Sequence, residues 1–277
     1  IIGSYLTIFL TDALLFGAGH WGNANTHIIK DGWYDEIRIS SRALSPCEFL
    51  TPVSLAEQDP VLFARGEDGT YGGIAGRYAF SAEASGDVSL SLEARTGSEI
   101  RDSRGEKLFD NRRGIALNGG TVTYDGKGAL NARSATVELF LKGVGSGAVL
   151  TCAADCDSDR LLWRFLGDGV LEIRTSDRAE PTAFRLPGCV PGDGKIHHFA
   201  LSYAADAEGM EVKAYWDHKE VFSRDFAAGF DLSSPIGLIL GSAAFTGGVD
   251  ELRMCRGVQT PDDMLYAHTA GLMILVR

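Results

Sequence analysis

A short motif that carries two carboxylates and an arginine occurs twice in this sequence. In both copies an Asp-Glu pair is followed by an apolar residue, an arginine and a second apolar residue. Two carboxylates are the usual acid and base of glycoside hydrolysis, but neighbouring residues on a strand point to opposite faces, so this pair cannot flank one bond. We therefore expect a structural role, in which the aspartate accepts hydrogen bonds from a turn and the arginine pairs with a carboxylate. The motif residues are Asp35, Glu36 and Arg38 in the first copy, and Asp250, Glu251 and Arg253 in the second.

Two adjacent histidines, His197 and His198, have the chemistry of metal ligands or of an acid–base pair. They lie in an alternating segment that predicts a strand, and alternation sends their side chains to opposite faces. They cannot then bind one ion, and we expect both to support the fold. No phosphate-binding glycine loop or dinucleotide fingerprint follows any predicted strand, so nucleotide chemistry is not indicated.

An acidic loop at residues 152–159 is the one segment that suggests a metal. Asp155, Asp157 and Asp159 alternate with other residues, as in the first part of an oxygen-rich calcium loop. The loop lacks the glycine and the distal glutamate of an EF-hand. We expect a solvated acidic turn and at most weak calcium binding, with Cys152 and Cys156 either free or bridged to each other.

Aromatic side chains on loops could stack on the C–H faces of sugar rings. The sequence has four tryptophans, and we expect most of them to be in the core. Trp21 is the best candidate for an exposed one, because its loop has no counterpart in the second copy of the repeat. The candidates for ligand binding are Trp21, Trp163 and Trp216, with Trp33 as the fourth tryptophan.

Composition limits the possible partners and location. The 277 residues include 37 acidic and 26 basic ones, for a net charge of −11, and no dense basic run that could follow a nucleic-acid backbone. Nucleic acid is therefore excluded as an expected partner. The apolar stretch at residues 1–19 is interrupted by Asp12 and several hydroxyl residues, and the one at 271–276 is too short to span a bilayer. We expect no membrane insertion.

The repeated motif also indicates how the chain is divided into domains. The two copies stay in one register from the Asp-Glu pair to Ser45-Pro46 and Thr260-Pro261. Their separation suits the length of a sandwich domain and exceeds that of a solenoid repeat, which takes about 20 to 50 residues. We therefore predict that residues 1–55 are the last strands of an incomplete first domain. Residues 60–265 would form a complete domain of the same type, and residues 266–277 a tail or linker.

Period-two alternation predicts antiparallel β structure through most of the chain. Glycine-containing turns such as Asn118-Gly119-Gly120 separate the alternating segments. Only residues 261–269 are predicted to be helical, with Thr260 as the N-cap and Pro261 at the first position. The alternating segments are Val88–Leu92, Val137–Leu141, Leu171–Arg174, Phe199–Tyr203 and Val212–Tyr215.

Two segments resemble a known family. Residues 195–203 and 212–218 are similar to the W-H-H-V-A-L…Y…Y-v-D-G hairpin of laminin G-like, concanavalin A-like domains, with Ile196 in place of Trp and His218 in place of Gly. The closing Gly-x-Asp-Glu-hydrophobic-Arg segment looks like the last strand of the same family, pentraxin-like members included. The resemblance implies an all-β, concanavalin A-like jelly-roll sandwich of two antiparallel sheets.

The resemblance also sets the expected function. Laminarinase-type glycosidases share this fold and carry Glu-x-Asp-x-x-Glu on a strand, a spacing that this chain lacks, so we expect no enzyme of that class. We expect a non-catalytic module of a larger secreted or cell-surface protein, with a glycan or an extracellular protein as its partner. The alternatives are a structural spacer without a ligand, and an accessory domain of an extracellular carbohydrate-active enzyme. The only cofactor suggested is calcium.

Overall fold

The computed structural model describes residues 18–21, 24–28, 60–65, 69, 71, 73–75, 78–80 and 82–268. The chain divides into two units, residues 1–51 and 52–277. In the first unit, strands β1 (Ala18–Trp21) and β2 (Ala24–Ile28) form an antiparallel hairpin. The first copy of the motif, Asp35, Glu36 and Arg38, lies outside the described residues, as does Trp33.

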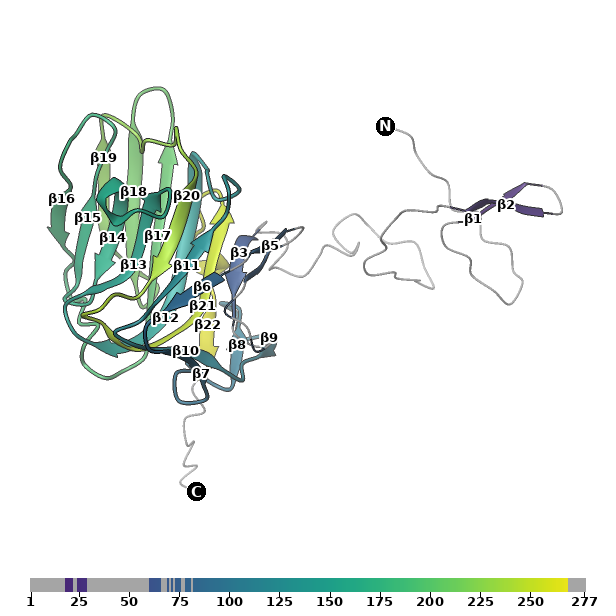
Figure 1. The fold of residues 1–277 in the computed structure, drawn as a ribbon, viewed down its shortest axis with the longest axis horizontal. Helices are drawn as coiled ribbons and strands as arrows, with labels where there is room; N and C mark the ends of the chain where they lie inside the picture. The colour runs from purple at the N-terminus through teal and green to yellow at the C-terminus, as the bar shows by residue number, and fades with distance from the viewer. Residues whose placement is uncertain are drawn as a thin grey trace, which may run out of the picture. The chain divides into compact units, whose positions relative to one another are not determined.

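Two large antiparallel sheets form the second unit (Figure 1). The eight-stranded sheet has the order β19 (Lys219–Phe226), β18 (Met210–Trp216), β17 (His197–Ala205), β12 (Ser134–Val144), β21 (Thr246–Arg256), β10 (Gly114–Asn118) and β7 (Val88–Ser91), with β3 (Pro60–Ala64) also paired to β21. The seven-stranded sheet has the order β16 (Thr182–Arg185), β15 (Val170–Ile173), β14 (Leu161–Leu166), β13 (Ala148–Ala154), β20 (Ile236–Leu240), β11 (Thr121–Asp125) and β6 (Ala82–Ser85). All five alternating segments predicted as strands lie in these sheets, and the all-β, jelly-roll sandwich prediction is confirmed.

Smaller elements complete the second unit. A three-stranded sheet has the order β22 (Tyr266–His268), β8 (Glu99–Arg101) and β9 (Lys107–Asp110), and β4 (Gly73–Ala75) pairs with β5 (Tyr78–Phe80). Two single-turn 3₁₀ helices, η2 (Ser158–Arg160) and η3 (Pro261–Asp263), are also present.

The short helical turn predicted within residues 261–269 is present, but it ends at Asp263 and does not extend to residue 269. Thr260 and Pro261 do begin a helix, and the Asp263 carboxylate accepts hydrogen bonds from the Thr260 amide at 3.1 Å and hydroxyl at 2.7 Å. The chain then becomes extended, with Met264 and Leu265 buried, and continues into β22. Burial of two consecutive apolar residues and pairing with β8 stabilise the extended backbone more than local helix propensity stabilises a second turn.

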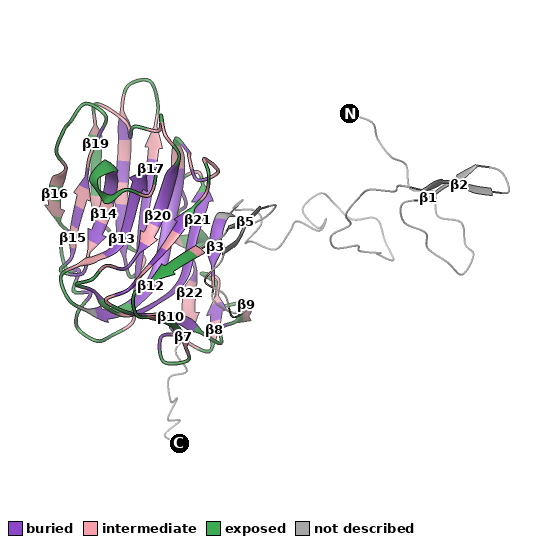
Figure 2. Cartoon of the chain, viewed as in Figure 1, coloured by how far each residue is buried: buried purple, intermediate pink, exposed green. Residues whose placement is uncertain are grey.

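Alternation along the strands places the core between the two sheets (Figure 2). On β12, Val137, Leu139 and Leu141 face the main core, whereas Glu138 and Phe140 lie on the opposite, outer face. The rings of Phe165 and Phe199, from β14 and β17, stack across the interface with centroids 3.9 Å apart. Phe140 belongs to a second, smaller core, beneath the three-stranded sheet, with Ile100 and Leu265.

The β17–β18 hairpin carries the segment that resembles the laminin G-like family. Asp217 and His218 follow β18 with φ angles of 49° and 64°. Positive φ at two consecutive residues is the geometry of a type I′ turn, which glycine and asparagine adopt most easily. His218 therefore adopts a left-handed backbone conformation, at the position where the family usually has glycine.

A β-bulge in β21 changes the face that successive residues present. On β12 one residue lies between Glu138 and Phe140, whereas on β21 two residues lie between their partners Arg253 and Asp250. Glu251 supplies the extra residue, with a φ of 52°. As a result Asp250 and Arg253 both lie on the outer face of the sheet, while Leu252 remains in the main core.

A buried ionic cluster on this outer face joins three strands to the C-terminal segment. Glu138 accepts hydrogen bonds from Arg253 Nε at 2.6 Å, His198 Nε2 at 2.8 Å and the Leu265 amide at 3.0 Å. Its side chain, like those of Arg253 and His198, is at most 2% exposed. Burial alone would raise the pKa of Glu138, but the charge of Arg253 and the His198 hydrogen bond lower it to about 2. Glu138 is therefore a carboxylate at neutral pH.

Asp250 forms a second buried cluster a few residues away. Its Oδ2 atom accepts hydrogen bonds from the Thr96 amide at 2.9 Å, the Thr96 hydroxyl at 3.0 Å and Asn111 Nδ2 at 2.6 Å. Burial raises the pKa of Asp250 to about 6, despite these donors. The neighbouring Glu251 carboxylate is bound instead by Arg65 Nε, at 3.1 Å.

Removal of the arginine from the first cluster tests its contribution to stability. We expect Arg253→Met to lower the free energy of unfolding by about 3 to 5 kcal/mol, because it leaves the Glu138 carboxylate buried without its cation. Urea unfolding measures the change. Arg185→Met is the control, because Arg185 is exposed and pairs with Asp168 at 3.7 Å, so its loss should cost less than about 1 kcal/mol. Equal effects of the two substitutions would contradict the cluster's importance.

The raised pKa of Asp250 predicts a pH dependence. The folded state takes up a proton at Asp250 near pH 6, because its pKa is raised to about 6, whereas the unfolded chain does so only near the ordinary aspartate pKa of 3.8. Protonation of Asp250 therefore favours the folded state. This contribution to the free energy of unfolding is fully present below about pH 4 and is lost as the pH rises through 6. The stability difference between the wild type and Asp250→Asn should therefore shrink between pH 4 and pH 7, as measured by unfolding at several pH values. A constant difference would show that Asp250 does not titrate in this range.

Candidate functional site

One end of the sandwich brings together loops from both large sheets, and we call this end the rim. The strands that border these loops begin or end at the same edge, because neighbouring strands are antiparallel. The rim loops are residues 126–133, 155–160, 174–181, 206–209 and 227–235.

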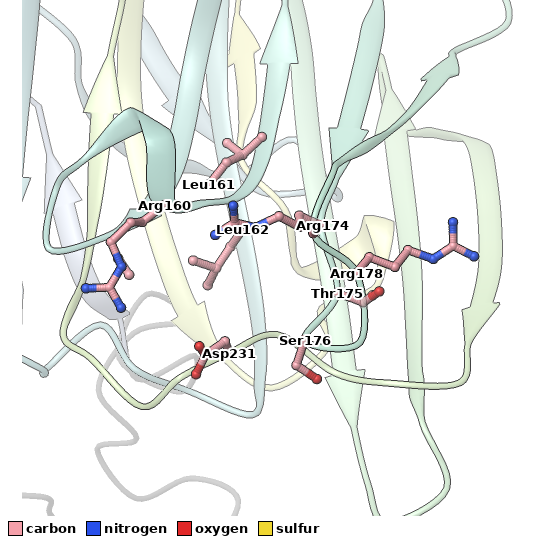
Figure 3. Close-up of a pocket in the computed structure, with 10 residues that line it drawn as sticks. Arg160, Leu161, Leu162, Arg174, Thr175, Ser176, Arg178 and Asp231 are labelled. Carbon is pink, nitrogen blue, oxygen red and sulfur yellow. The ribbon is translucent and has the colours of Figure 1, made fainter.

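A cavity of about 230 Å³, the polar pocket, opens on the rim (Figure 3). Its floor is made of leucine and alanine side chains, including Leu161 and Leu162 at the start of β14. Its polar lining comes from three separate loops and consists of Arg160, Arg174, Thr175, Ser176, Arg178 and Asp231.

Contacts outside the polar pocket orient its arginines. Arg160 forms an ion pair with Asp155, and its Nη2 donates to Ser234 Oγ at 3.1 Å. Arg174 Nη1 donates to the Asp159 carbonyl at 3.1 Å. In Figure 3 the Arg178 side chain extends away from Arg160 and Asp231. Each guanidinium has five N–H groups, so Arg160 and Arg174 retain donors for a ligand.

Asp231 supplies the acceptor of the polar pocket. It is exposed, and its Oδ1 accepts a hydrogen bond from the Ser233 amide at 3.0 Å. Hydrogen bonds from Ser233 and the charges of Arg160 and Arg174 lower its pKa, so it is ionised at neutral pH. A carboxylate opposite guanidinium donors suits vicinal hydroxyl groups, each of which can donate to one and accept from the other.

A second cavity of about 530 Å³, the apolar pocket, lies beside the first. Ala132, Tyr203, Ala205, Phe230 and Leu232 form most of its wall, and Arg133 and Asp206 add charge. Phe230 is 9% exposed and packs edge-on against Tyr203, with centroids 5.0 Å apart.

The segment 229–235 lies between the two pockets, and the Asn131 side chain makes three of the hydrogen bonds that hold it. Asn131 Nδ2 donates to the carbonyls of Leu232 and Ser234 at 3.1 and 2.8 Å, and its Oδ1 accepts from the Ile236 amide at 2.8 Å. The backbone adds hydrogen bonds from the Ser176 amide to Gly229 and from the Asp155 amide to Pro235. This network makes the wall between the pockets a fixed one.

Two of the three tryptophans predicted as ligand-binding residues, Trp163 and Trp216, lie in the core of the second unit. Trp163 is completely buried and Trp216 is 6% exposed, and both belong to the main core. Their rings therefore offer no surface on which a sugar could stack, because neighbouring core side chains cover them. Trp21 lies on β1, in the first unit.

The predicted calcium ligands do not converge. Asp155 pairs with Arg160, and Asp157 Oδ1 accepts the Asp159 amide at 3.0 Å, which caps η2. Among the residues that the structure describes, no group of three such side chains is arranged to hold a metal. Calcium binding stays a prediction. Cys152 and Cys156 form no disulfide.

The two adjacent histidines have separate partners. His197 Nδ1 and Nε2 lie 2.9 and 3.0 Å from carboxylate oxygens of Asp217 and Asp193, and its ring stacks on Trp216. His198 contacts Glu138 on the outer face of the eight-stranded sheet. The structure thus brings Arg253 and His198 together through Glu138, while Asp250 and Glu251 contact other groups.

The polar pocket was missed by the sequence analysis, apart from the acidic loop at its edge. Arg160, Arg174 and Asp231 lie on loops far apart in the chain, and none belongs to a motif with recognisable spacing. Only the positions of the loops at one end of the sandwich bring these residues together.

The architecture defines the protein as a jelly-roll β-sandwich. No family model and no curated protein matches the sequence. Among solved structures, the chain is similar to domain 4 of AbnA, a GH43 extracellular arabinanase from Geobacillus stearothermophilus, in complex with arabinotriose. The TM-score is 0.54 at 19% identity, over 74% of this chain and 96% of that one.

Two toxin domains have a similar fold. The receptor binding domain of a botulinum neurotoxin C/D mosaic serotype and the binding domain of Paraclostridial Mosquitocidal Protein 1 each match with a TM-score of 0.52, at 10% and 9% identity. The matches cover 74% and 76% of this chain but only 49% and 51% of those chains. At these identities the similarity establishes the fold. Among the described residues, no helix is long and apolar enough to cross a membrane.

Asn131 provides a test of how the rim is held. We expect Asn131→Ala to lower the free energy of unfolding by about 1 to 3 kcal/mol, because two carbonyls and one amide lose their partner. Hydrogen exchange of the Ile236 amide should accelerate in the same variant. Asn118→Ala is the control. Asn118 is exposed and its side-chain amide donates to Asp87, so its loss should change stability by less than about 0.5 kcal/mol. Unchanged exchange at Ile236 would show that Asn131 does not hold this segment.

Proposed function

We propose that this chain is a non-catalytic binding module that recognises a glycan at the rim. The observation that carries the proposal is the polar pocket, where the guanidinium groups of Arg160 and Arg174 and the ionised Asp231 line one small cavity. Sugar hydroxyls both donate and accept hydrogen bonds, and this lining offers partners for both. Leucine and alanine side chains also line the cavity, and ligand sites usually combine such groups with a few polar ones.

The lining of the polar pocket favours binding over hydrolysis. It contains one carboxylate, Asp231, whereas most glycosidases need two that flank the scissile bond. It contains no histidine or cysteine that could serve as a base or nucleophile. The glutamate and histidine that do contact each other, Glu138 and His198, are buried and out of reach of a ligand.

The similar structures support the same proposal. The arabinanase domain is described in complex with arabinotriose, and the toxin domains are described as binding domains. The arabinanase match also supports an accessory domain of an extracellular carbohydrate-active enzyme as the second candidate. We propose membership of the laminin G-like group, with residues 60–265 as the domain and residues 1–55 as the end of a similar one. Secretion or surface display of the parent protein follows from the same proposal.

Titration of the chain against arabinotriose and a panel of neutral oligosaccharides from xylan and β-glucan tests the proposal. We expect binding by calorimetry, and a rise in melting temperature, because a ligand of the native state stabilises it. Arg174→Gln and Asp231→Asn should each weaken binding by roughly ten- to a hundredfold, the value of a hydrogen bond to a charged group.

Arg185→Gln is the matched control, because Arg185 is an exposed arginine outside the rim, and its binding should equal that of the wild type. Absence of binding to every glycan would refute the proposal and favour a protein partner or a spacer. Binding that Arg174→Gln and Asp231→Asn leave unchanged would place the glycan site elsewhere.

A further inference from the structure

The two rim cavities differ in chemistry and are separated by very little chain. Asp231 lines the polar pocket, and its immediate neighbours Phe230 and Leu232 line the apolar pocket. The wall between them is thus the backbone of the segment 229–235, which Asn131 holds in place. A ligand that lies across Asp231 contacts both cavities without any movement of the chain.

Size indicates that the polar pocket takes only part of a ligand. Ligand pockets usually enclose about 300 to 1,000 Å³, and the polar pocket, at about 230 Å³, is below this range. The apolar pocket, at about 530 Å³, adds the missing volume. The two together have the dimensions of one elongated site.

The polar and apolar groups of the two pockets suit successive units of a sugar chain. Each sugar unit has edges that carry hydroxyl groups and faces that carry C–H groups. Arg174 and Asp231 offer charged donors and an acceptor to the hydroxyls of one unit, while the half-buried Leu232 and the exposed Ala207 offer an apolar surface to the C–H face of the next. Arg133 and Asp206 can bind the outward hydroxyls of that second unit.

The net charge of this region favours a neutral chain. Three arginines line the polar pocket, and the charges of Asp231 and of Asp155, which pairs with Arg160, offset two of the three positive charges. The protein as a whole carries a net charge of −11, which repels polyanions at long range.

We infer that the polar and apolar pockets are two subsites of one site, which binds a neutral oligosaccharide of at least two units lying across Asp231. The inference rests on the proposed function and goes further, because it specifies a chain in place of a single sugar and assigns a different part of the chain to each pocket.

Two exposed alanines allow each subsite to be filled separately. Ala179 lines the polar pocket and Ala207 the apolar pocket, and both are on exposed loops where a larger side chain need not disturb the core. Ala179→Trp and Ala207→Trp therefore block one pocket each. Ala227→Trp is the matched control, because Ala227 is also exposed on a rim loop and lines neither pocket.

Calorimetry with neutral oligosaccharides of one to four units, prepared from arabinan, xylan and β-glucan, tests the inference. Affinity should rise at least tenfold from one unit to two or three units of the sugar that binds. Both blocking variants should weaken binding of the three-unit chain at least tenfold, while Ala227→Trp leaves it unchanged. Ala207→Trp should leave the single sugar bound as in the wild type. Melting temperatures of the variants establish that they are folded.

The other outcomes separate this inference from the proposed function. If a glycan binds with the same affinity at every length, or if Ala207→Trp has no effect on the three-unit chain, the two-subsite inference is wrong and the polar pocket acts alone. If neither blocking variant affects a glycan that does bind, both pockets are excluded. If no sugar of any length binds, the proposed function fails, and the inference fails with it.

Discussion

The buried carboxylate of Glu138 is the interaction on which the outer face of the eight-stranded sheet depends. It joins β12 to β17 through His198, to β21 through Arg253, and to the C-terminal segment through the Leu265 amide. A charge at this depth is tolerated only because each of its oxygens has close partners. The same contacts position Leu265 over the smaller core and allow β22 to pair with β8. One ionised side chain thus connects the sheet to the segment that covers it.

The rim is organised by a neutral counterpart of this cluster. Asn131 satisfies two carbonyls and one amide of the segment that separates the pockets. The polar groups that stabilise the sheet are therefore different from those that we propose for recognition. Glu138 and its partners are buried on the outer face of one sheet, whereas Arg174 and Asp231 remain accessible at the end of the sandwich.

Sequence patterns predicted the strands well but could not distinguish buried aromatic residues from exposed ones. Period-two alternation is a property of a single strand, so Val137–Leu141 and Phe199–Tyr203 could be assigned without knowledge of their neighbours. The tryptophans were harder to place, because the same large ring suits a core and a sugar-binding surface. Trp163 and Trp216 proved to be core residues. The helix after Thr260 was overestimated, since its capping signal is local whereas the burial of Met264 and Leu265 is not.

By itself the sequence determined the fold class, the alternation of inward and outward residues, and the opposite directions of His197 and His198. These features follow from the local geometry of a strand, in which successive side chains point to opposite faces of the sheet. Only the tertiary structure decided which outward groups meet. The extra residue at Glu251 turns Asp250 and Arg253 to the same face, and strand order brings Glu138 between Arg253 and His198. Likewise, the pairing of distant strands gathers Arg160, Arg174 and Asp231 at one rim, because contacts between loops depend on register and connectivity that no local pattern encodes.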